Sequence, residues 1–332
     1  MPRRRNTVKL RLFAAVAAAA LALAGCGQVE DPSTGAQPAG GAAQPATVQT
    51  MFGAVTVPAN PRKVVALGWS DAETALALGV QPIAASDWLA FGGEGVGPWA
   101  AGKYTTAPQI LPTLELDYAA IAQLQPDVIL NTRSDNSEDK YKELSKIAPT
   151  VSAPSGVVAY GTTWRQQMEL VSQALGKADE GKKLISEVDA AFDKAKADHP
   201  VLNGKQVAVG AYYSDKYSAY VRGDSRVDFL ESLGMKNKPE VQALATGSFS
   251  VDLSREQIEL LSSDLTVLFP IGSDATPLKN DPILGSIPSA KAGHLLILED
   301  KTLINAFSSG STLGTLYAID KATPMFAQQL GS

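Results

Sequence analysis

The longest amphipathic segment of the chain lies near its centre, at residues 177–199. Its apolar residues recur at the three- and four-residue spacing of one helix face, and they are Leu184, Val188, Ala191, Phe192 and Ala195. Gly176 precedes the segment, and Pro200 ends it because the residue before a proline is pushed out of the helical region. The pattern predicts a rigid helix of about 20 residues, or about 30 Å.

Short apolar runs alternate with amphipathic segments on both sides of this helix. Strands are predicted at residues 63–67, 83–85, 128–130 and 150–152 before it, and at residues 207–213, 265–269 and 295–298 after it. Helices are predicted between them, at residues 71–78, 117–124, 139–147, 225–233, from 254 onward, and at 312–330. Alternating strands and helices indicate parallel sheets flanked by helices.

The second half of the chain repeats a pattern of the first. Residues 117–127 and 254–264 place a helix cap, an Ile, a Leu and an Asp at identical offsets, each before an apolar strand. We therefore expect an α/β fold of two lobes, each a mainly parallel sheet, joined by the long helix. The predicted boundaries are 59–175 for the first lobe, 176–200 for the connecting helix and 201–332 for the second lobe. The alternative is one large α/β domain.

The N-terminus has the pattern of a targeting segment. A basic stretch from Arg3 to Arg11 precedes the apolar residues 12–24, which are too few for a comfortable membrane span. Leu23-Ala24-Gly25-Cys26 then resembles the lipobox of bacterial lipoproteins, which implies cleavage before Cys26 and acylation of its sulfur. Residues 1–25 are thus predicted to be a signal peptide. Residues 26–58, rich in Ala, Gly, Pro and Gln at their start, are predicted to be a flexible tether.

Composition excludes several kinds of function. The 332 residues are 45% hydrophobic and 19% charged, with a net charge of -5 that gives no reason to expect nucleic acid. A single cysteine allows no disulfide within the chain, and two histidines, His199 and His294, leave little material for a metal site. No nucleophile is paired with a base in a recognisable motif, so an enzyme is not expected.

Candidate ligand-binding residues of the first lobe follow its predicted strands, because ligands bind beyond the carboxyl ends of parallel strands. Trp69, Trp88 and Trp99 lie in such loops and can form an aromatic wall. Arg133 follows the strand at 128–130 and can present a fork of donors to an anionic oxygen. The alternative for Arg133 is a surface pair with Asp135 or Glu138.

Further candidates lie nearer the second lobe. Tyr160 and Trp164 flank the start of the helix that precedes the connector, and Tyr213, Tyr217 and Arg222 follow the strand at 207–213. This tyrosine-rich hairpin could equally serve packing. Arg226 ranks behind Arg133 and Arg222, because it could pair with Asp228 or Glu231 on the surface.

These features together resemble a known family, the substrate-binding lipoproteins of ABC importers for ferric siderophores, haem and cobalamin. The resemblance begins near Pro61 and rests on NPRKVVALGWSDAETALALGVQPIA, DYAAIAQLQPDVIL, SREQIELLSSDLTVL and DPILGSIPSAKAGHLLILED. It implies a class III-type periplasmic binding protein that is not an enzyme, has no cofactor and binds its ligand between two lobes. It further implies delivery to an ABC permease, extracytoplasmic anchoring to the cell membrane through Cys26, and a monomer.

The resemblance also implies docking and ligand classes. The family presents one glutamate near the tip of each lobe to the permease; the matching positions here are Glu256 and Ala119, with Glu115 or Asp117 as substitutes for the latter. A ferric siderophore is the expected ligand, and its own oxygens would surround the iron, so that no protein metal ligand is needed. Haem and cobalamin are the alternatives, and a lipid-anchored α/β enzyme is a further one.

Overall fold

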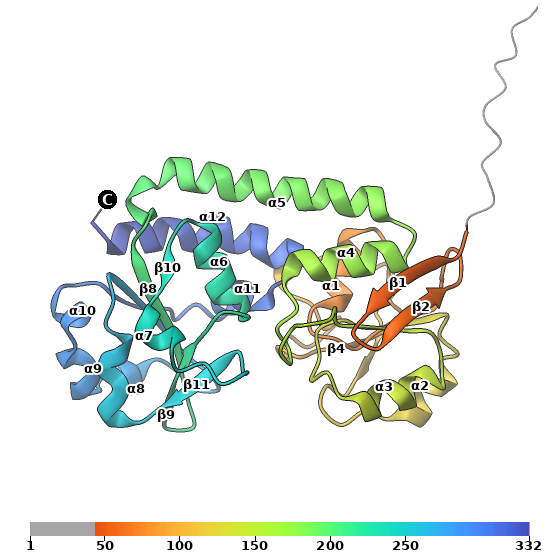
Figure 1. Ribbon diagram of the computed structural model, residues 1–332, viewed down its shortest axis with the longest axis horizontal. Coiled ribbons are helices and arrows are strands. Elements are labelled where there is room, and N and C mark those ends of the chain that lie inside the picture. Colours follow the sequence, from red (N-terminus) through yellow and green to blue (C-terminus); the bar gives the residue numbers. More distant parts are fainter. Residues whose placement is uncertain (1–43, 332) are drawn as a thin grey trace, which may run out of the picture. The chain divides into compact units, whose positions relative to one another are not determined.

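The first lobe is built on a sheet of five parallel strands. Its order is β5-β4-β3-β6-β7, with β3 (Val64–Ala66) at the centre. The other strands are β4 (Ala84–Ser86), β5 (Gln109–Leu111), β6 (Val128–Asn131) and β7 (Thr150–Ser152). The helices of this lobe are α1 (Asp71–Ala77), η1 (Pro98–Ala100), α2 (Tyr118–Gln123), α3 (Glu138–Ser145) and α4 (Trp164–Ala174). Both faces of the sheet are covered, which explains why β3, β6 and β7 are buried along their whole length (Figure 1).

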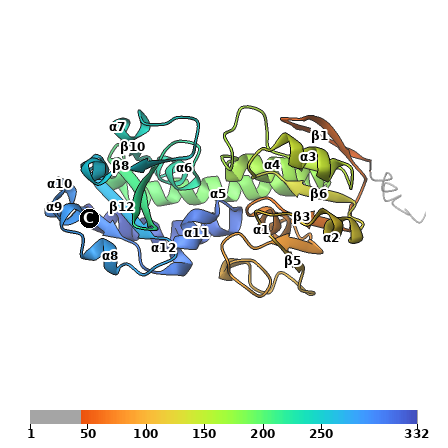
Figure 2. The same cartoon turned by 90° about the horizontal axis from the view of Figure 1, so that it is seen from below.

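The second lobe has a mixed sheet of order β11-β9-β8-β12-β13, with the short β10 (Lys236–Asn237) also paired to β8. Strands β8 (Gln206–Tyr213), β12 (Leu265–Pro270) and β13 (Leu295–Ile297) are parallel, whereas β9 (Lys216–Tyr220) runs antiparallel to both β8 and β11 (Ser250–Leu253). The helices are α6 (Ser225–Ser232), α7 (Pro239–Gln242), η3 (Arg255–Leu261), α8 (Thr276–Lys279), α9 (Pro282–Ser286), α10 (Pro288–Lys291), α11 (Lys301–Ser309) and α12 (Thr312–Gln329). Figure 2 shows these elements from below.

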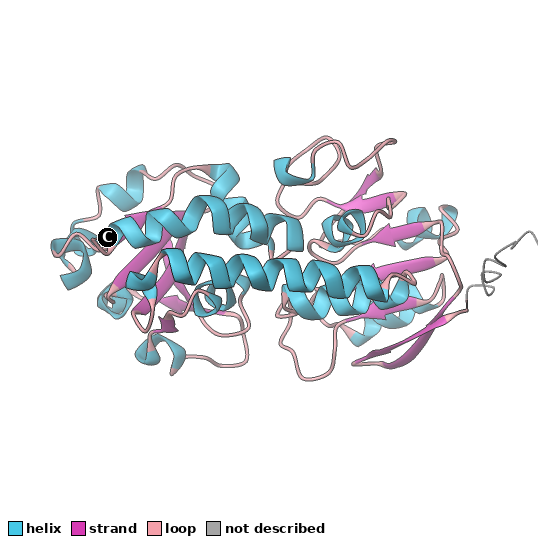
Figure 3. Cartoon of the chain, turned by 90° about the horizontal axis from the view of Figure 1, so that it is seen from above, coloured by secondary structure: helices cyan, strands magenta, loops and turns pink. Residues whose placement is uncertain are grey.

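The long helix α5 (Ala178–Asp198) connects the two lobes, and the short η2 (Pro200–Leu202) follows it. Leu184 and Ile185 in its first half pack on the core of the first lobe. Val188 and Phe192, further along, are buried in the core of the second lobe. Figure 3 shows α5 beside α12, against which it packs. Because one helix contributes to both cores, it can hold the lobes with little freedom to twist.

An aspartate carboxylate fixes the start of a central strand in each lobe. The Asp127 carboxylate accepts the backbone N–H groups of Arg62 and Lys63 just before β3. Asp264, at the matching offset of the repeat, accepts the backbone N–H of Gln206 at the start of β8. Asp127 directly precedes β6, the neighbour of β3, and Asp264 directly precedes β12, the neighbour of β8. This shared arrangement supports the duplication predicted from the sequence.

An antiparallel hairpin replaces part of the predicted tether. The computed structural model describes residues 44–331, so Cys26, the signal peptide and the first part of the tether lie outside the described residues. Strands β1 (Ala46–Thr50) and β2 (Gly53–Val57) pair with each other. Val48, Val55 and Val57 alternate with more exposed residues and face the core of the first lobe. Their burial explains why this segment forms a hairpin and not a flexible tether. The tether predicted for residues 26–58 is therefore wrong at its C-terminal end.

Residues 44–331 belong to one compact unit, and the expected fold class of two α/β lobes joined by a long helix is confirmed. The lobe boundaries set from the sequence stay a prediction. Within residues 44–331, none of the helices combines the length and the apolarity needed to cross a membrane.

Candidate ligand-binding site

The rim of the first lobe is built where β3 and β6 end side by side. The Trp69 N–H donates to the Arg133 carbonyl over 2.8 Å, so the two chain segments continue together beyond the sheet. Gly68 is required at this crossing, because a Cβ there would lie 2.9 Å from the backbone nitrogens of both Thr132 and Arg133. Ser70 follows in the left-handed conformation and starts α1. The rim therefore projects the Trp69 and Arg133 side chains from adjacent strand ends.

A buried carboxylate fixes this rim. Asp71 accepts hydrogen bonds from the Thr132 backbone N–H over 2.9 Å, from the Thr132 hydroxyl and from the Gln167 amide. The same Gln167 amide donates to the Trp69 carbonyl over 2.8 Å. Burial raises the pKa of Asp71 to about 6, although these hydrogen bonds favour its ionised form. The network holds α1, α4 and both strand ends in one arrangement.

Three aromatic rings form a stacked column on this rim. The Trp69 ring lies between Trp88, at 4.2 Å and 6° from parallel, and Tyr160, at 4.1 Å and 28°. Phe249, from the loop before β11 in the second lobe, meets Trp69 and Tyr160 edge-on at 6.5 and 6.2 Å. The column is thus capped by the opposite lobe. Its faces and edges suit the organic body of a bulky ligand.

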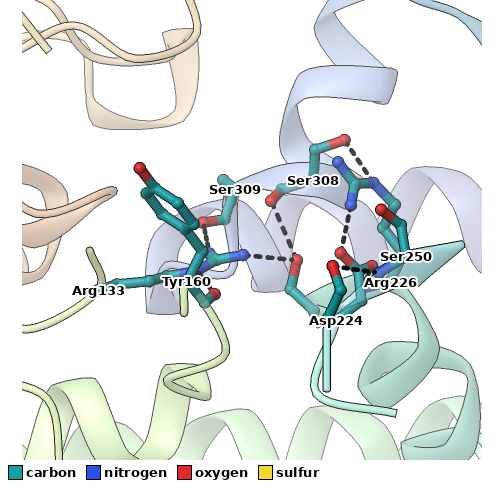
Figure 4. A network of polar contacts seen from close by, with 9 residues as sticks. Arg133, Tyr160, Asp224, Arg226, Ser250, Ser308 and Ser309 are labelled. Carbon is teal, nitrogen blue, oxygen red and sulfur yellow. Dashed lines mark hydrogen bonds and ion pairs between the residues drawn. The ribbon is translucent and has the colours of Figure 1, made fainter. Parts of the chain in front are cut away.

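Arg133 sits beside the column and is 2% exposed. Its Nε donates to the Tyr160 carbonyl (2.9 Å), Nη1 to the Ser309 carbonyl (2.7 Å) and Nη2 to the Ser225 hydroxyl (3.2 Å), as Figure 4 shows. The guanidinium lies 5.8 Å from the Trp69 ring centre and 5.6 Å from that of Trp88. Burial lowers its pKa to about 10. The predicted position beside the cleft is therefore found, and the alternative of a surface pair with Asp135 or Glu138 is wrong.

The turn between α11 and α12 joins the two lobes at the back of the site. The Ser309 carbonyl accepts from the Ser70 hydroxyl (2.7 Å) as well as from Arg133. The Ser311 hydroxyl donates to the buried carboxylate of Glu73, which also accepts from Trp99 Nε1 (2.9 Å). These contacts are buried, and burial raises the pKa of Glu73. Trp99 thus supports the lobe junction instead of joining the stacked column.

A second arginine completes the site from the other lobe. Arg226 pairs with Asp224 over 2.6 Å and donates to the Ser308 hydroxyl (Figure 4). Its guanidinium lies 4.1 Å from the centre of the Tyr220 ring. Tyr220 stacks between Phe249 and Phe269. The expected surface pairing of Arg226 with Asp228 or Glu231 is wrong, because its side chain is buried and Asp224 is its partner.

The remaining candidates lie apart from this cluster. Arg222 is exposed and pairs with Glu231 over 2.9 Å. Tyr217 is 2% exposed and donates to Asp281 within the core behind the sheet, so the packing alternative holds for it. Tyr213 is 59% exposed at the end of β8. Trp164 lines a hollow of about 520 Å³ between α4, α5 and α6 and contacts Arg165 there.

Sequence reasoning missed Phe249 and undervalued Arg226. Phe249 lies in an irregular loop with no periodic pattern around it, so nothing in the sequence marks it. Arg226 follows the helix cap Asp224 by two residues, and that spacing was the available signal for the ion pair.

The crevice in front of the column is small in this conformation. It is lined by Trp69, Asn131, Arg133, Asp135, Lys140 and Tyr160, among others, and holds about 10 Å³. That is room for about one water molecule, whereas small-molecule sites measure about 300–1,000 Å³. A chelate can enter only if the residues that line the crevice, all of them from the first lobe, move apart. No group of three or more His, Cys, Asp or Glu residues that could hold a metal ion occurs between residues 44 and 331.

The predicted docking residues lie at the starts of two helices. Glu256 is exposed in the first turn of η3 and borders a hollow of about 250 Å³ with Arg255, Glu259 and Ile283. Hydrogen bonds from its own backbone N–H and from Ser254 lower the pKa of Glu256. Asp117 caps α2 by accepting the Ala120 N–H over 2.9 Å, so this carboxylate already has a structural role. Glu115 is exposed beside Leu114, which is 66% exposed.

Several solved structures share this architecture. A solute-binding protein of Mycobacterium smegmatis is 30% identical, with a TM-score of 0.75 over 87% of this chain and 99% of that one. The iron-uptake substrate-binding protein PiaA of Streptococcus pneumoniae, solved with ferrichrome, is 27% identical, with a TM-score of 0.74 over 86% and 98% of the two chains.

Sequence comparison agrees with the structural one. The probable siderophore-binding lipoprotein YfiY of Bacillus subtilis is 30% identical over 232 residues, which cover 66% of this chain and 66% of that relative's own length. A family model described as periplasmic binding protein matches residues 64–302, which include both sheets and the helix between them. The chain is therefore a member of the periplasmic binding protein family, whose members bind substrates and are not enzymes.

Proposed function

We propose that this protein binds a ferric siderophore between its two lobes and delivers it to the permease of an ABC importer. The observation that carries the proposal is the stacked column of Trp88, Trp69 and Tyr160 beside the buried cation Arg133, at the place where the lobes meet. Aromatic faces suit the organic body of a chelate, and an arginine suits its oxygens. The names of the relatives, which include ferric-citrate and petrobactin binders, point to the same class of ligand.

Tryptophan fluorescence tests this proposal directly, because two of the four tryptophans belong to the column. We expect a saturable change with at least one ferric siderophore at micromolar concentration or below, and weaker responses to haem and cobalamin. The apo-siderophores serve as controls. A response to haem or cobalamin alone would reassign the site, and turnover of a substrate would favour the enzyme alternative.

Anchoring through acylated Cys26 and an extracytoplasmic location belong to the same proposal. The supporting observation is the lipobox-like sequence Leu23-Ala24-Gly25-Cys26. Full-length protein expressed in a bacterium should fractionate with the membrane, and Cys26→Ala should not. Equal distribution of the two would contradict the anchor.

Docking to the permease is assigned to the exposed tips of the two lobes. Glu256 is available in the second lobe; in the first lobe, Asp117 is the helix cap and Glu115 is the freer acid. Glu256→Ala should leave siderophore affinity unchanged and slow uptake into cells. Glu259→Ala, which borders the same hollow, is the matched control. Normal uptake by Glu256→Ala would contradict this role.

A further inference from the structure

The basic side chains around the site already have partners of their own. Arg226 and Asp224 form an ion pair whose side chains are 9% and 2% exposed. Lys140, which lines the crevice in front of the column, pairs with Asp135 over 2.7 Å. Arg222, the other basic candidate from the sequence, pairs with Glu231. None of these three cations is free to neutralise a charged ligand without first giving up a carboxylate.

Arg133 forms no ion pair with any residue in the range 44–331, but nearby carboxylates partly offset its charge. Its three hydrogen bonds go to the neutral oxygens of Tyr160, Ser309 and Ser225. Asp224, Asp228 and Asp71 lie close enough for their charges to favour its ionised form. The site thus holds three cations, Arg133, Lys140 and Arg226, and the acids Asp71, Asp135 and Asp224, with Asp228 as a fourth acid that keeps its proton until about pH 7. Three carboxylates therefore balance the three cations at neutral pH even where Asp228 is protonated.

The charge of ferric chelates differs sharply between siderophore classes. Three hydroxamate groups carry one negative charge each and cancel the charge of Fe³⁺. Three catecholates carry two each and leave a trianion. Transfer of a trianion into a site without free cations leaves buried charge uncompensated, which is strongly unfavourable. A neutral chelate requires only apolar walls and hydrogen-bond groups.

We infer that the ligand is a neutral or weakly charged ferric chelate of the trihydroxamate class, and that the site discriminates against highly anionic chelates such as ferric tris-catecholates. The inference rests on the proposed function and adds the charge class of the ligand. Discrimination arises from the acids Asp135 and Asp224, which occupy the cations that an anionic chelate would need. The stacked rings of Trp69, Trp88 and Tyr160 supply the apolar wall.

Separate titrations with two chelates measure the discrimination. The full chain is titrated with ferrichrome, a neutral trihydroxamate chelate, and with a ferric tris-catecholate, both followed by tryptophan fluorescence with correction for absorption. Ferrichrome should bind at least about tenfold more tightly, a difference of about 1.4 kcal/mol. Equal or tighter binding of the tris-catecholate would overturn the inference and leave the proposed function standing. Failure of every ferric chelate would overturn both.

A charge-removing variant tests the cause. Asp135→Asn frees Lys140 in the crevice, and asparagine can still accept the N–H bond that Asp135 receives from Ser137. The preference for ferrichrome should fall at least about threefold, because an unpaired cation now faces the ligand. Asp139→Asn removes the same charge from a 97% exposed side chain on α3, the helix that carries Lys140, and should leave the preference unchanged. An identical preference in wild type and Asp135→Asn would overturn the charge argument.

Discussion

Gly310 lies against the guanidinium of Arg133, and no room is left between them for a side chain. A Cβ at position 310 would overlap Arg133 Nη1 and lie 3.1 Å from the Ser225 Cβ. Gly310 ends α11 in the left-handed conformation, with φ of 60°. One glycine thus lets the turn of the second lobe approach the rim of the first.

Gly310→Ala should therefore destabilise the protein for two reasons. The left-handed backbone costs a non-glycine residue about 1–2 kcal/mol, and the overlap with Arg133 adds to that cost. Gly176→Ala is the matched control, because Gly176 has φ of 67° and open space around it. Urea unfolding should show a larger loss for Gly310→Ala than for Gly176→Ala. Equal losses would contradict the close contact with Arg133.

Arg133→Ala should weaken both ligand binding and the junction between the lobes. A hydrogen bond to a charged group contributes about 1.5–3 kcal/mol, so affinity for the ferric siderophore should fall about ten- to a hundredfold. Thermal stability should also fall, because Arg133 binds the Ser309 carbonyl of the second lobe. Arg165→Ala removes a partly exposed pair with Asp189 and serves as the control. Affinity within twofold of wild type would remove Arg133 from the site.

Phe249→Ala should strengthen siderophore binding. The Phe249 ring meets Trp69 and Tyr160 edge-on and covers this end of the stacked column from the second lobe. Each aromatic pair contributes about 0.5–1.5 kcal/mol, and the ligand must replace these contacts. We expect affinity to rise about three- to tenfold. Phe249→Leu should give an intermediate value. Weaker binding by Phe249→Ala would instead make the ring a wall that contacts the ligand.

Asp228 should make stability depend on pH. Burial, together with the charges of Asp224 and Glu231, raises its pKa from 3.8 to about 7, against the opposing effects of Arg133 and the Gly223 N–H. The unfolded chain loses this proton near its ordinary pKa, whereas the folded protein keeps it until about pH 7. The folded state therefore binds more protons between these values, and stability falls as pH rises through that window.

Asp228→Asn should remove this part of the pH dependence. Its unfolding free energy should fall less than that of wild type as pH rises from about 4 to about 7, and above that range it should be the more stable protein. Urea titrations of wild type and Asp228→Asn at several pH values measure the two unfolding free energies. Asp139→Asn controls for the loss of one negative charge. A wild-type pH profile in Asp228→Asn would show that Asp228 ionises normally in the fold.

The sequence predicted most of the parallel strands and longer helices because local pattern decides them, but it did not predict β5, β11 or α11. The mostly apolar, buried runs of β6 and β12 and the helix caps Asp117 and Ser254 are local signals, and the matching roles of Asp127 and Asp264 follow from the repeat. The hairpin at residues 46–57 was not predicted, because its two short strands directly follow an Ala- and Pro-rich stretch that has the composition of a tether.

Placement of the site residues depends on contacts between distant segments, which sequence pattern does not encode. Trp69, Trp88 and Arg133 follow strands of one sheet, so topology alone brings them together. Trp99 was expected in a loop of the same rim, but its indole N–H donates a hydrogen bond to Glu73, away from the stacked column. Tyr217 points to the rear of its sheet because strand alternation sends it there.

The near-parallel stack of Trp69 on Trp88 also gives the protein an optical signature. Two identical indole chromophores 4.2 Å apart mix their excited states, and the mixing produces paired bands of opposite sign in circular dichroism. Any rearrangement of the rim that slides or tilts one ring changes the coupling between them. The opening of the cleft is therefore visible in the unlabelled protein, as a change of spectral shape that needs no added dye.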